Sequence, residues 1–306
     1  MTPKFKFNTD YHCPTGKLES VAPGLRRITA DNPGPLTFRG TGTYVIGENQ
    51  VAVIDPGPND PKHIEALMRE LGKESITHIL VTHTHHDHSA GTALLQQHCK
   101  APSYAMGTHT ALQRPSVLPR QLDSAGDTNF VPDVVLNDGD IIETEQWSLQ
   151  CLHTPGHASN HAAFAEPAHH RVFVGDLVMG WSTPVLLPPD GHLGDYLQSL
   201  KRLLSRQEQQ YWPTHGAPIK NPKALLEHLL GHRSARIDSV FDAVKRGHAT
   251  LAAIVNDAYP DLDPTLLPAA ERSTLASVIY LIDQQRLQGN LEAGLNMTCR
   301  IPDSPS

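Results

Sequence analysis

A short stretch of the chain concentrates residue types that bind metal ions. Residues 82–88 have the sequence THTHHDH and directly follow the apolar run of residues 76–81. Neutral imidazole and carboxylate groups are good ligands for divalent ions such as zinc, so this spacing favours a metal site. A solvated, histidine-rich loop is the alternative interpretation, because the chain contains 19 histidines. Residues elsewhere in the chain have to decide between the two.

Three further candidate ligands each follow a predicted strand. Rigid strands aim the side chains of the short loops that follow them, and α/β folds assemble their sites in this way. A single histidine or aspartate after a turn is usually a surface residue, but several such positions together are better explained by one shared metal site. The three positions are His157 in HTPGH after residues 147–153, Asp176 at the end of VFVGD, and His215 in WPTHG.

The elements that have to position the first stretch are strands and one amphipathic helix. Asp60 and Pro61 open this helix as N-cap and first helical residue, and Gly72 closes it. The pattern of apolar and turn residues predicts the remaining elements. They are strands over residues 25–29, 41–47, 51–55 and 76–81, a hairpin loop over residues 48–50, and a second helix through Leu95 after the histidine-rich loop.

The second half of the chain begins with a long aperiodic segment. Residues 113–135 are rich in Pro, Asp and Ser, and a segment of this length inside a domain predicts a functional insertion such as a lid near the site. Beyond it, short apolar runs predict four strands, a helix and a fifth strand. The strands cover residues 141–142, 147–153, 162–165 and 171–174, the helix residues 194–204, and the last strand residues 211–212.

Composition changes after Pro222, and the remaining residues predict a small helical module. Three helices are expected over residues 221–247, 250–259 and 269–288, followed by a β-like tail over residues 291–301. Three helices and a terminal hairpin are typical of a winged-helix-like domain. We therefore expect two domains, a catalytic one over residues 1–221 and the winged-helix-like one over residues 222–306.

Overall composition indicates a globular protein outside membranes. The 306 residues are 39% hydrophobic and 19% charged, and no apolar run approaches the roughly 20 residues that a membrane span needs. The N-terminus lacks the apolar core of a signal peptide, so a cytoplasmic location is expected. The cysteines Cys13, Cys99, Cys151 and Cys299 form no CxxC pair, which favours reduced thiols over disulfides. A net charge of −7 disfavours nonspecific binding of polyanions.

The four motifs, in this order, resemble the full motif set of the metallo-β-lactamase superfamily. They are residues 82–88, TPGH ending at His157, GD ending at Asp176, and PTHG around His215, and the resemblance covers about residues 20–220. Residues 41–47, residues 53–57 (VIDPG) and the C-terminal module further resemble the branch that contains lactamase-β-like-2 endoribonucleases and hydroxyacylglutathione hydrolase-like enzymes. The resemblance implies an α/β fold, an αββα sandwich with the site at one edge.

The resemblance also implies a ligand set for two divalent metal ions. His83, His85 and His157 would bind the first ion, Asp87, His88 and His215 the second, and Asp176 would bridge them. The nitrogen-rich set favours Zn²⁺, and the bridging carboxylate would also tolerate Mn²⁺ or Fe²⁺. A hydroxide shared by the ions would be the nucleophile, oriented by Asp87 as the catalytic residue. β-Lactamases of the superfamily place Cys or Ser where this chain has Asp176, so β-lactam hydrolysis is expected only as a weak side activity.

A few residues outside the ligand set are candidates for supporting roles. Asp55, at the end of its strand, is a candidate partner for a ligand histidine. Tyr196, His161 and His192 are candidate proton donors to the leaving group, with a structural role as the alternative for each. Arg39 could bind an anionic substrate, or it lies on the surface. His86 occupies the variable position of the motif and is expected not to be a ligand.

The leading functional hypothesis is hydrolysis of an ester, thioester or lactone-type bond in a small molecule. A single-strand endoribonuclease is the alternative within enzymes, and a DNA-binding ligand sensor is the alternative of another class. From residue 223 onward the chain has eight basic and ten acidic residues, and residues 269–288 contain only two arginines against two acidic residues. Tight binding of nucleic acid usually needs a positive surface, so both alternatives are disfavoured. The module is instead expected to shape the substrate cleft or to form a homodimer contact.

Overall fold

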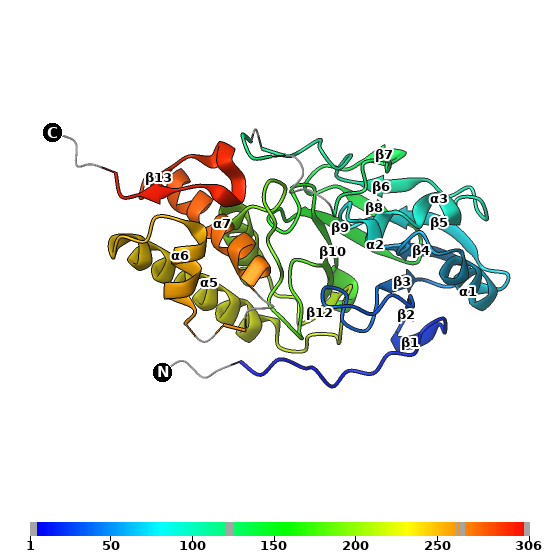
Figure 1. The fold of residues 1–306 in the computed structure, drawn as a ribbon. Coiled ribbons are helices and arrows are strands. Elements are labelled where there is room, and N and C mark those ends of the chain that lie inside the picture. Colours follow the sequence, from blue (N-terminus) through cyan, green and yellow to red (C-terminus); the bar gives the residue numbers. More distant parts are fainter. Residues whose placement is uncertain (1–4, 115, 120–124, 261, 264–266, 303–306) are drawn as a thin grey trace.

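Two β-sheets lie in the middle of the molecule (Figure 1). The computed structural model describes residues 5–114, 116–119, 125–260, 262–263 and 267–302. Within the described residues, one sheet has seven strands in the order β1 to β7 and the other has five in the order β12-β11-β10-β9-β8. The first sheet contains β1 (Glu19–Ala22), β2 (Leu25–Thr29), β3 (Gly42–Ile46), β4 (Gln50–Ile54), β5 (Ser75–Leu80), β6 (Ser103–Ala105) and β7 (Val134–Val135). The second contains β8 (Ile141–Glu143), β9 (Ser148–His153), β10 (Ala162–Glu166), β11 (Arg171–Gly175) and β12 (Gln210–Pro213).

Helices cover both outer faces of this pair of sheets (Figure 1). The helices of the first half are short, apart from α1, and those of the second half are long. They are α1 (Pro61–Leu71), α2 (His86–Ser89), α3 (Thr92–Leu95), α4 (Leu193–Leu204), α5 (Pro222–Lys245), α6 (Leu251–Ala258) and α7 (Leu267–Asp283).

The layers follow from the alternation of side chains along the strands, because successive residues point to opposite faces of a sheet. In β4, Val53 packs in a cluster with α1, whereas Ile54 lies in the core between the sheets. In β11, Val172 packs in a cluster with α4 and α5, whereas Phe173 lies between the sheets. The four layers confirm the predicted αββα sandwich.

Strand direction determines which strand ends meet. In the first sheet β1 to β4 are antiparallel neighbours, whereas β4 to β7 run parallel. In the second sheet β8 to β11 are antiparallel neighbours, and β12 is parallel to β11. Therefore β4 and β5 end at one edge of their sheet, and β9, β11 and β12 end at one edge of theirs.

The loop after β5 contains more regular structure than the sequence predicts. The predicted helix through Leu95 is confirmed as α3, but the stretch predicted as a loop itself forms the single turn α2. Gly91 separates the two helices, and its backbone N–H donates to the carbonyl of Gly57 at 2.8 Å. A Cβ atom at residue 91 would lie 2.9 Å from that carbonyl oxygen, so the close approach of the two chain segments requires glycine here.

The C-terminal segment contains the three predicted helices, but the third ends earlier than expected. Helix α7 ends at Asp283 and not near residue 288, because Gln285 adopts a left-handed backbone with φ of 57°. Of the β-like tail predicted over residues 291–301, only β14 (Cys299–Arg300) is a strand; it pairs with β13 (Gln288–Gly289), and a 3₁₀ helix, Leu291–Asn296, lies between the two strands. The sequence did not predict this helix.

Helices α5 and α7 share one hydrophobic core with the outer face of the second sheet. Leu225 and Leu229 of α5 and Leu281 of α7 belong to the same cluster as Val172 of β11. Asn221 caps α5 by accepting from the backbone N–H of Ala224 at 3.3 Å. The C-terminal helices therefore pack directly on the sandwich, and a domain boundary at residue 221 stays a prediction.

Among the described helices, none combines the length and the apolar character that a bilayer-spanning helix needs.

An ionic cluster joins α4, α7 and the aperiodic segment. His192 Nδ1 lies 3.1 Å from Asp195 Oδ2, and His192 Nε2 lies 2.9 Å from Asp283 Oδ2. Arg114 donates to Asp195 from Nε at 2.9 Å and from Nη2 at 2.5 Å. Burial lowers the pKa of His192, but the hydrogen bonds with Asp195 and Asp283 raise it by more, so that the net pKa is raised. The imidazole of His192 thus links α4 to the end of α7.

Replacing His192 by asparagine is expected to cost stability at low pH more than at high pH. Because the folded-state pKa of His192 is raised above the unfolded value, its contribution is fully present below about pH 6.5 and is lost as pH rises through the folded pKa. With Asp283 partly exposed, the difference in free energy of unfolding between the two proteins should be about 1 kcal/mol at pH 5.5 and smaller at pH 9. Urea unfolding at both pH values measures it, and a gap that widened with pH would contradict the assignment.

Candidate metal centre

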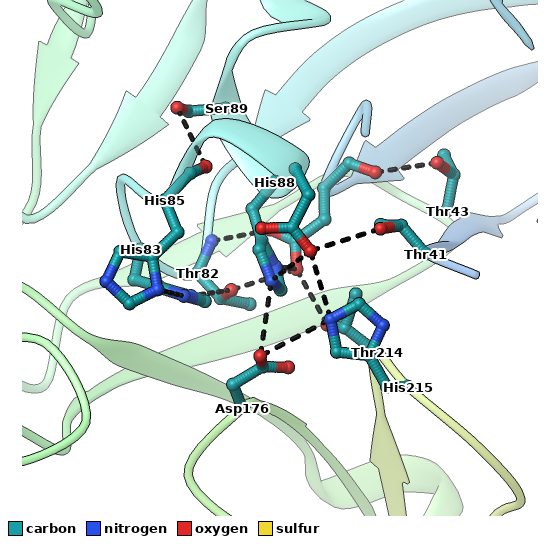
Figure 2. Close-up of polar contacts among 12 residues, drawn as sticks. Thr41, Thr43, Thr82, His83, His85, His88, Ser89, Asp176, Thr214 and His215 are labelled. Atoms are coloured by element: carbon teal, nitrogen blue, oxygen red, sulfur yellow. Dashed lines mark hydrogen bonds and ion pairs between the residues drawn. The ribbon is translucent and has the colours of Figure 1, made fainter. Parts of the chain in front are cut away.

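Loops that follow five strands converge at one edge of the sandwich, and Figure 2 shows His88, Asp176 and His215 facing one another there. These loops follow β4, β5, β9, β11 and β12 and contain all seven predicted ligands together with Asp55. The turn after β9 depends on Gly156, which has φ of 138° and touches the backbone of α4. A Cβ atom at residue 156 would lie 2.3 Å from the Cα atom of Tyr196, so only glycine lets this loop bring His157 inward.

Three histidines form a first group of converging nitrogen atoms. His85 Nδ1 lies 3.0 Å from His83 Nε2 and 3.1 Å from His157 Nε2. Burial, and then the neighbouring imidazoles, hold the pKa of His83 well below its usual value and lower that of His85 to about 3. Burial also lowers the pKa of His157. All three imidazoles are therefore neutral near pH 7, with lone pairs that can bind a cation.

A second group combines two histidines with a carboxylate. Asp87 Oδ2 lies 3.1 Å from His215 Nε2 and 3.5 Å from His88 Nε2. Burial lowers the pKa of His215, but Asp176 and Asp87 raise it by more, to about 9. The pKa of His88 is raised for the same kind of reason, against the effect of burial. The carboxylates of this group therefore favour positive charge at the site, which a bound cation would supply.

Asp176 lies between the two groups. Its Oδ2 atom is 3.3 Å from His215 Nε2, 3.5 Å from His88 Nε2 and 3.8 Å from His157 Nε2. Asp176 Oδ1 and His88 Nε2 are buried and have no hydrogen-bond partner among the described residues, an arrangement that costs free energy unless a ligand satisfies them. Within each group the candidate ligand atoms lie within 4.8 Å of one another. The imidazole and carboxylate donors of these groups suit divalent cations.

Asp55 joins three of the converging loops. Its Oδ2 atom accepts from the hydroxyls of Thr82 at 2.9 Å and Thr214 at 2.8 Å, and lies 2.9 Å from His88 Nδ1. Its Oδ1 atom accepts from the backbone N–H of Thr82 at 2.8 Å. The carboxylate is fully buried, so it fixes the orientation of the His88 ring and directs Nε2 toward the centre.

Backbone carbonyls orient two other ligand candidates. His157 Nδ1 lies 2.8 Å from the carbonyl oxygen of Val185, and His215 Nδ1 lies 3.2 Å from that of Gly40. Each Nδ1 atom is thus in position to donate its proton to a carbonyl. The Nε2 atom of each ring then faces the other candidate ligands.

Comparison with known proteins agrees with this geometry. Residues 36–212 match the family described as the metallo-β-lactamase superfamily. A relative described as β-lactamase-like protein 2 homolog, of Drosophila melanogaster, is 32% identical over 257 residues, which are 80% of this chain and 82% of that protein.

The chain belongs to the metallo-β-lactamase superfamily.

Two other matches bear on activity and on fold. An atrochrysone carboxyl ACP thioesterase of Cryptosporiopsis sp. (strain 8999) is 26% identical over 236 residues, 76% of this chain and 66% of that protein. A β-lactamase domain protein of known crystal structure, from Burkholderia ambifaria, covers 96% of both chains with a TM-score of 0.78 at 21% identity. The structural match extends the shared fold to the C-terminal helices, because it covers nearly the whole chain.

The remaining residues that the sequence singles out lie outside the two groups of candidate ligands. His161 is fully buried directly behind Asp176, and its Nε2 atom accepts from the backbone N–H of Asp176 at 3.3 Å. Tyr196 is fully buried, and burial raises its pKa to about 12. Arg39 is exposed, with its guanidinium 5.0 Å from the ring of Phe38. His86 is exposed on α2, outside both groups of candidate ligands.

Several residues at the site have no counterpart among the sequence predictions. Thr41 donates from its hydroxyl to Asp87 Oδ2 at 3.3 Å. Arg27, buried in β2, donates to the carbonyl oxygens of Gly216 at 2.6 Å and Thr214 at 3.0 Å, and so holds the loop that contains His215. Threonine and arginine in strands are ordinary residues, and nothing in their spacing identifies them.

Proposed function

We propose that the protein is a hydrolase that uses two divalent metal ions to cleave an ester, thioester or lactone-type bond. The observation that carries the proposal is the pair of three-ligand groups on either side of one shared carboxylate, Asp176. His83, His85 and His157 would hold one ion, and Asp87, His88 and His215 the other. Zn²⁺ suits a set with five imidazoles best, and Mn²⁺ or Fe²⁺ are the alternatives that a bridging carboxylate tolerates.

The protein residues would position the reactants, and Asp87 would accept a hydrogen bond from the attacking water. When bound, two divalent ions lower the pKa of a water molecule toward neutrality and polarise the carbonyl oxygen of the substrate. The side chain of Asp87 is 27% exposed, whereas that of Asp176 is 9% exposed, so Asp87 is the carboxylate that an incoming substrate and water reach. Asp87 would accept a hydrogen bond from the attacking water and orient it, while Thr41 holds its Oδ2 atom.

The chemical class of the substrate rests on two supports. A thioesterase stands among the relatives of the chain, and its name describes cleavage of an acyl thioester. The C-terminal segment from residue 223 onward has eight basic residues against ten acidic ones, which does not favour a polyanionic substrate. A small-molecule acyl compound therefore fits better than RNA, which remains the competing substrate within enzymes.

The C-terminal segment is proposed to act through packing and not through DNA binding. Its three helices and the β13–β14 pair would form a winged-helix-like module that shapes the substrate cleft from the side of α4, α5 and α7. The described part of α7 contains Arg272 as its one basic residue, beside Glu271 and Asp283, so it lacks the charge of a recognition helix.

A panel assay on purified protein of measured metal content tests the proposal. We expect about two divalent ions per chain and turnover of thioesters, aryl esters or lactones, with the activity removed by a chelator and restored by Zn²⁺. Phosphodiesters and single-stranded RNA serve as the competing substrates. Cleavage of RNA alone would overturn the substrate class, and a metal content near one ion per chain would overturn the binuclear centre.

A further inference from the structure

A short piece of the aperiodic segment pairs with the loop that contains the candidate ligands His83 and His85. Residues 125–127 lie antiparallel to this loop, with a β-bridge between His85 and Gly126. The backbone N–H of His86 donates to the carbonyl of Ala125 at 3.1 Å, and that of Asp127 donates to the carbonyl of Thr84 at 2.7 Å. Backbone hydrogen bonds therefore connect this part of the aperiodic segment to the loop that contains His83 and His85.

Asp127 adds a side-chain contact to Ser89, the last residue of α2. It is 5% exposed, and its Oδ2 atom accepts from the hydroxyl of Ser89 at 2.9 Å. The backbone N–H of Ser89 donates to the carbonyl of His85 at 3.1 Å, the first hydrogen bond of α2. Asp87 and His88 lie within this single turn. A four-residue helix is marginal by itself, so contacts from outside have to hold it.

Thr84 connects the same segment to the loop of a third ligand. Its hydroxyl oxygen accepts from Nδ2 of Asn160 at 2.9 Å, three residues after His157. It also lies 2.9 Å from Nδ1 of His109. The ring of His109 packs on Gly126 so closely that a Cβ atom there would lie 2.0 Å from His109 Nε2. Thr84 is fully buried, which makes this network rigid.

We propose that Asp127 and Gly126 are positioning residues of the metal centre. They hold the loop of residues 83–88 in the conformation in which His85 Nδ1 faces His83 Nε2 and His157 Nε2. Residues 125–127 of the aperiodic segment thus hold the loop of residues 83–88 in place through hydrogen bonds. The inference rests on the proposed role of these three histidines as metal ligands, and it does not depend on which substrate is cleaved.

The affinity of the protein for Zn²⁺ tests this inference without any substrate. Asp127→Ala removes the acceptor of Ser89, and we expect it to weaken Zn²⁺ binding about 10- to 100-fold, as loss of groups that orient metal ligands usually does. Asp127→Asn retains an oxygen acceptor and should restore most of the affinity. Competition with a chromophoric chelator, starting from metal-free full-length protein, gives the binding constants, and circular dichroism verifies the fold of each variant.

Asp133 provides a matched control in the same stretch of chain. Its Oδ2 atom accepts from the backbone N–H of Ser103 at 2.8 Å, from the Ser103 hydroxyl at 2.7 Å and from Gln96 at 2.8 Å, away from the ligands. Asp133→Ala should therefore leave Zn²⁺ affinity unchanged. Ser89→Ala removes the same hydrogen bond as Asp127→Ala from the other side, together with the contact of the Ser89 hydroxyl with the carbonyl oxygen of His85 at 3.3 Å, so the two effects on Zn²⁺ binding should be less than additive.

The outcomes separate this inference from the proposed function. Wild-type affinity in folded Asp127→Ala and Ser89→Ala, or an equal loss in Asp133→Ala, would overturn the positioning role. Weakened Zn²⁺ binding in Asp127→Ala together with a metal-loaded wild type that hydrolyses no acyl substrate would support the positioning role and overturn the proposed function. A wild-type protein without affinity for Zn²⁺, Mn²⁺ or Fe²⁺ would overturn both.

Discussion

Replacing Asp87 by alanine is expected to lower kcat by a factor between ~10² and ~10⁴, the range associated with loss of a positioned proton acceptor. The substitution removes the carboxylate that faces His215 Nε2 at 3.1 Å and His88 Nε2 at 3.5 Å. It therefore removes both a proposed ligand of the second ion and the group proposed to orient the attacking water. Steady-state kinetics on the best substrate of the panel, with metal content measured on the same sample, checks the result.

Two companion variants make this test specific. His86→Ala changes the adjacent residue, which is exposed and outside the ligand groups, and should leave kcat and metal content unchanged. Asp87→Asn keeps the shape of the side chain but not its charge, so it should retain the first ion and lose most activity. Full activity in Asp87→Ala with two bound ions would show that the nucleophile is oriented by another group.

Replacing Asp55 by alanine is expected to destabilise the fold by about 3–5 kcal/mol, as removal of one partner from a buried charged network does. The carboxylate is fully buried and receives hydrogen bonds from Thr82 and Thr214 beside its contact with His88. Its loss leaves several buried polar groups without a partner and frees three loops at once. Urea unfolding of the metal-free protein measures the free energy, and chelator competition measures the accompanying loss of Zn²⁺ affinity.

Asp60→Ala is the control for this second prediction. Asp60 lies five residues along the chain, and its side chain accepts one hydrogen bond, from the backbone N–H of Lys62 at 2.9 Å, as the N-cap of α1. Its removal should cost about 1 kcal/mol, typical of a helix cap, without any change in Zn²⁺ binding. Equal losses of stability in Asp55→Ala and Asp60→Ala would contradict the role of Asp55 as the residue that connects the loops.

The layered fold could be predicted from the sequence because its signals are local. The continuous apolar runs in β4 and β11 and the Asp60–Pro61 and Gly72 boundaries of α1 need no knowledge of distant contacts. The end of α7 could not be predicted in this way, because the helical pattern continues past Asp283 while Gln285 adopts a left-handed backbone. The short strands β1, β6 and β7 were also missed, since two to four residues give no clear period.

The supporting residues of the site could be predicted less well than the candidate ligands. Asp127 and Asn160 have no motif of their own, and their role depends on where the chain passes after the sheet has formed. His161 could be singled out from the sequence because it follows His157 closely. Only the structure shows that its Nε2 atom accepts a hydrogen bond from the backbone N–H of Asp176. Residues of this kind act through contacts between segments that are distant in the sequence.

The sequence by itself determined which residue types follow which strands, and so which side chains were candidates for a metal centre. Only the tertiary structure decided which atoms face one another and what charge they carry. His85 and His215 are the same residue type in the same motif set, yet the pKa of the first is lowered to about 3 and that of the second is raised to about 9. The physical reason is their surroundings, because burial among imidazoles disfavours a proton on His85, whereas Asp176 and Asp87 hold one on His215.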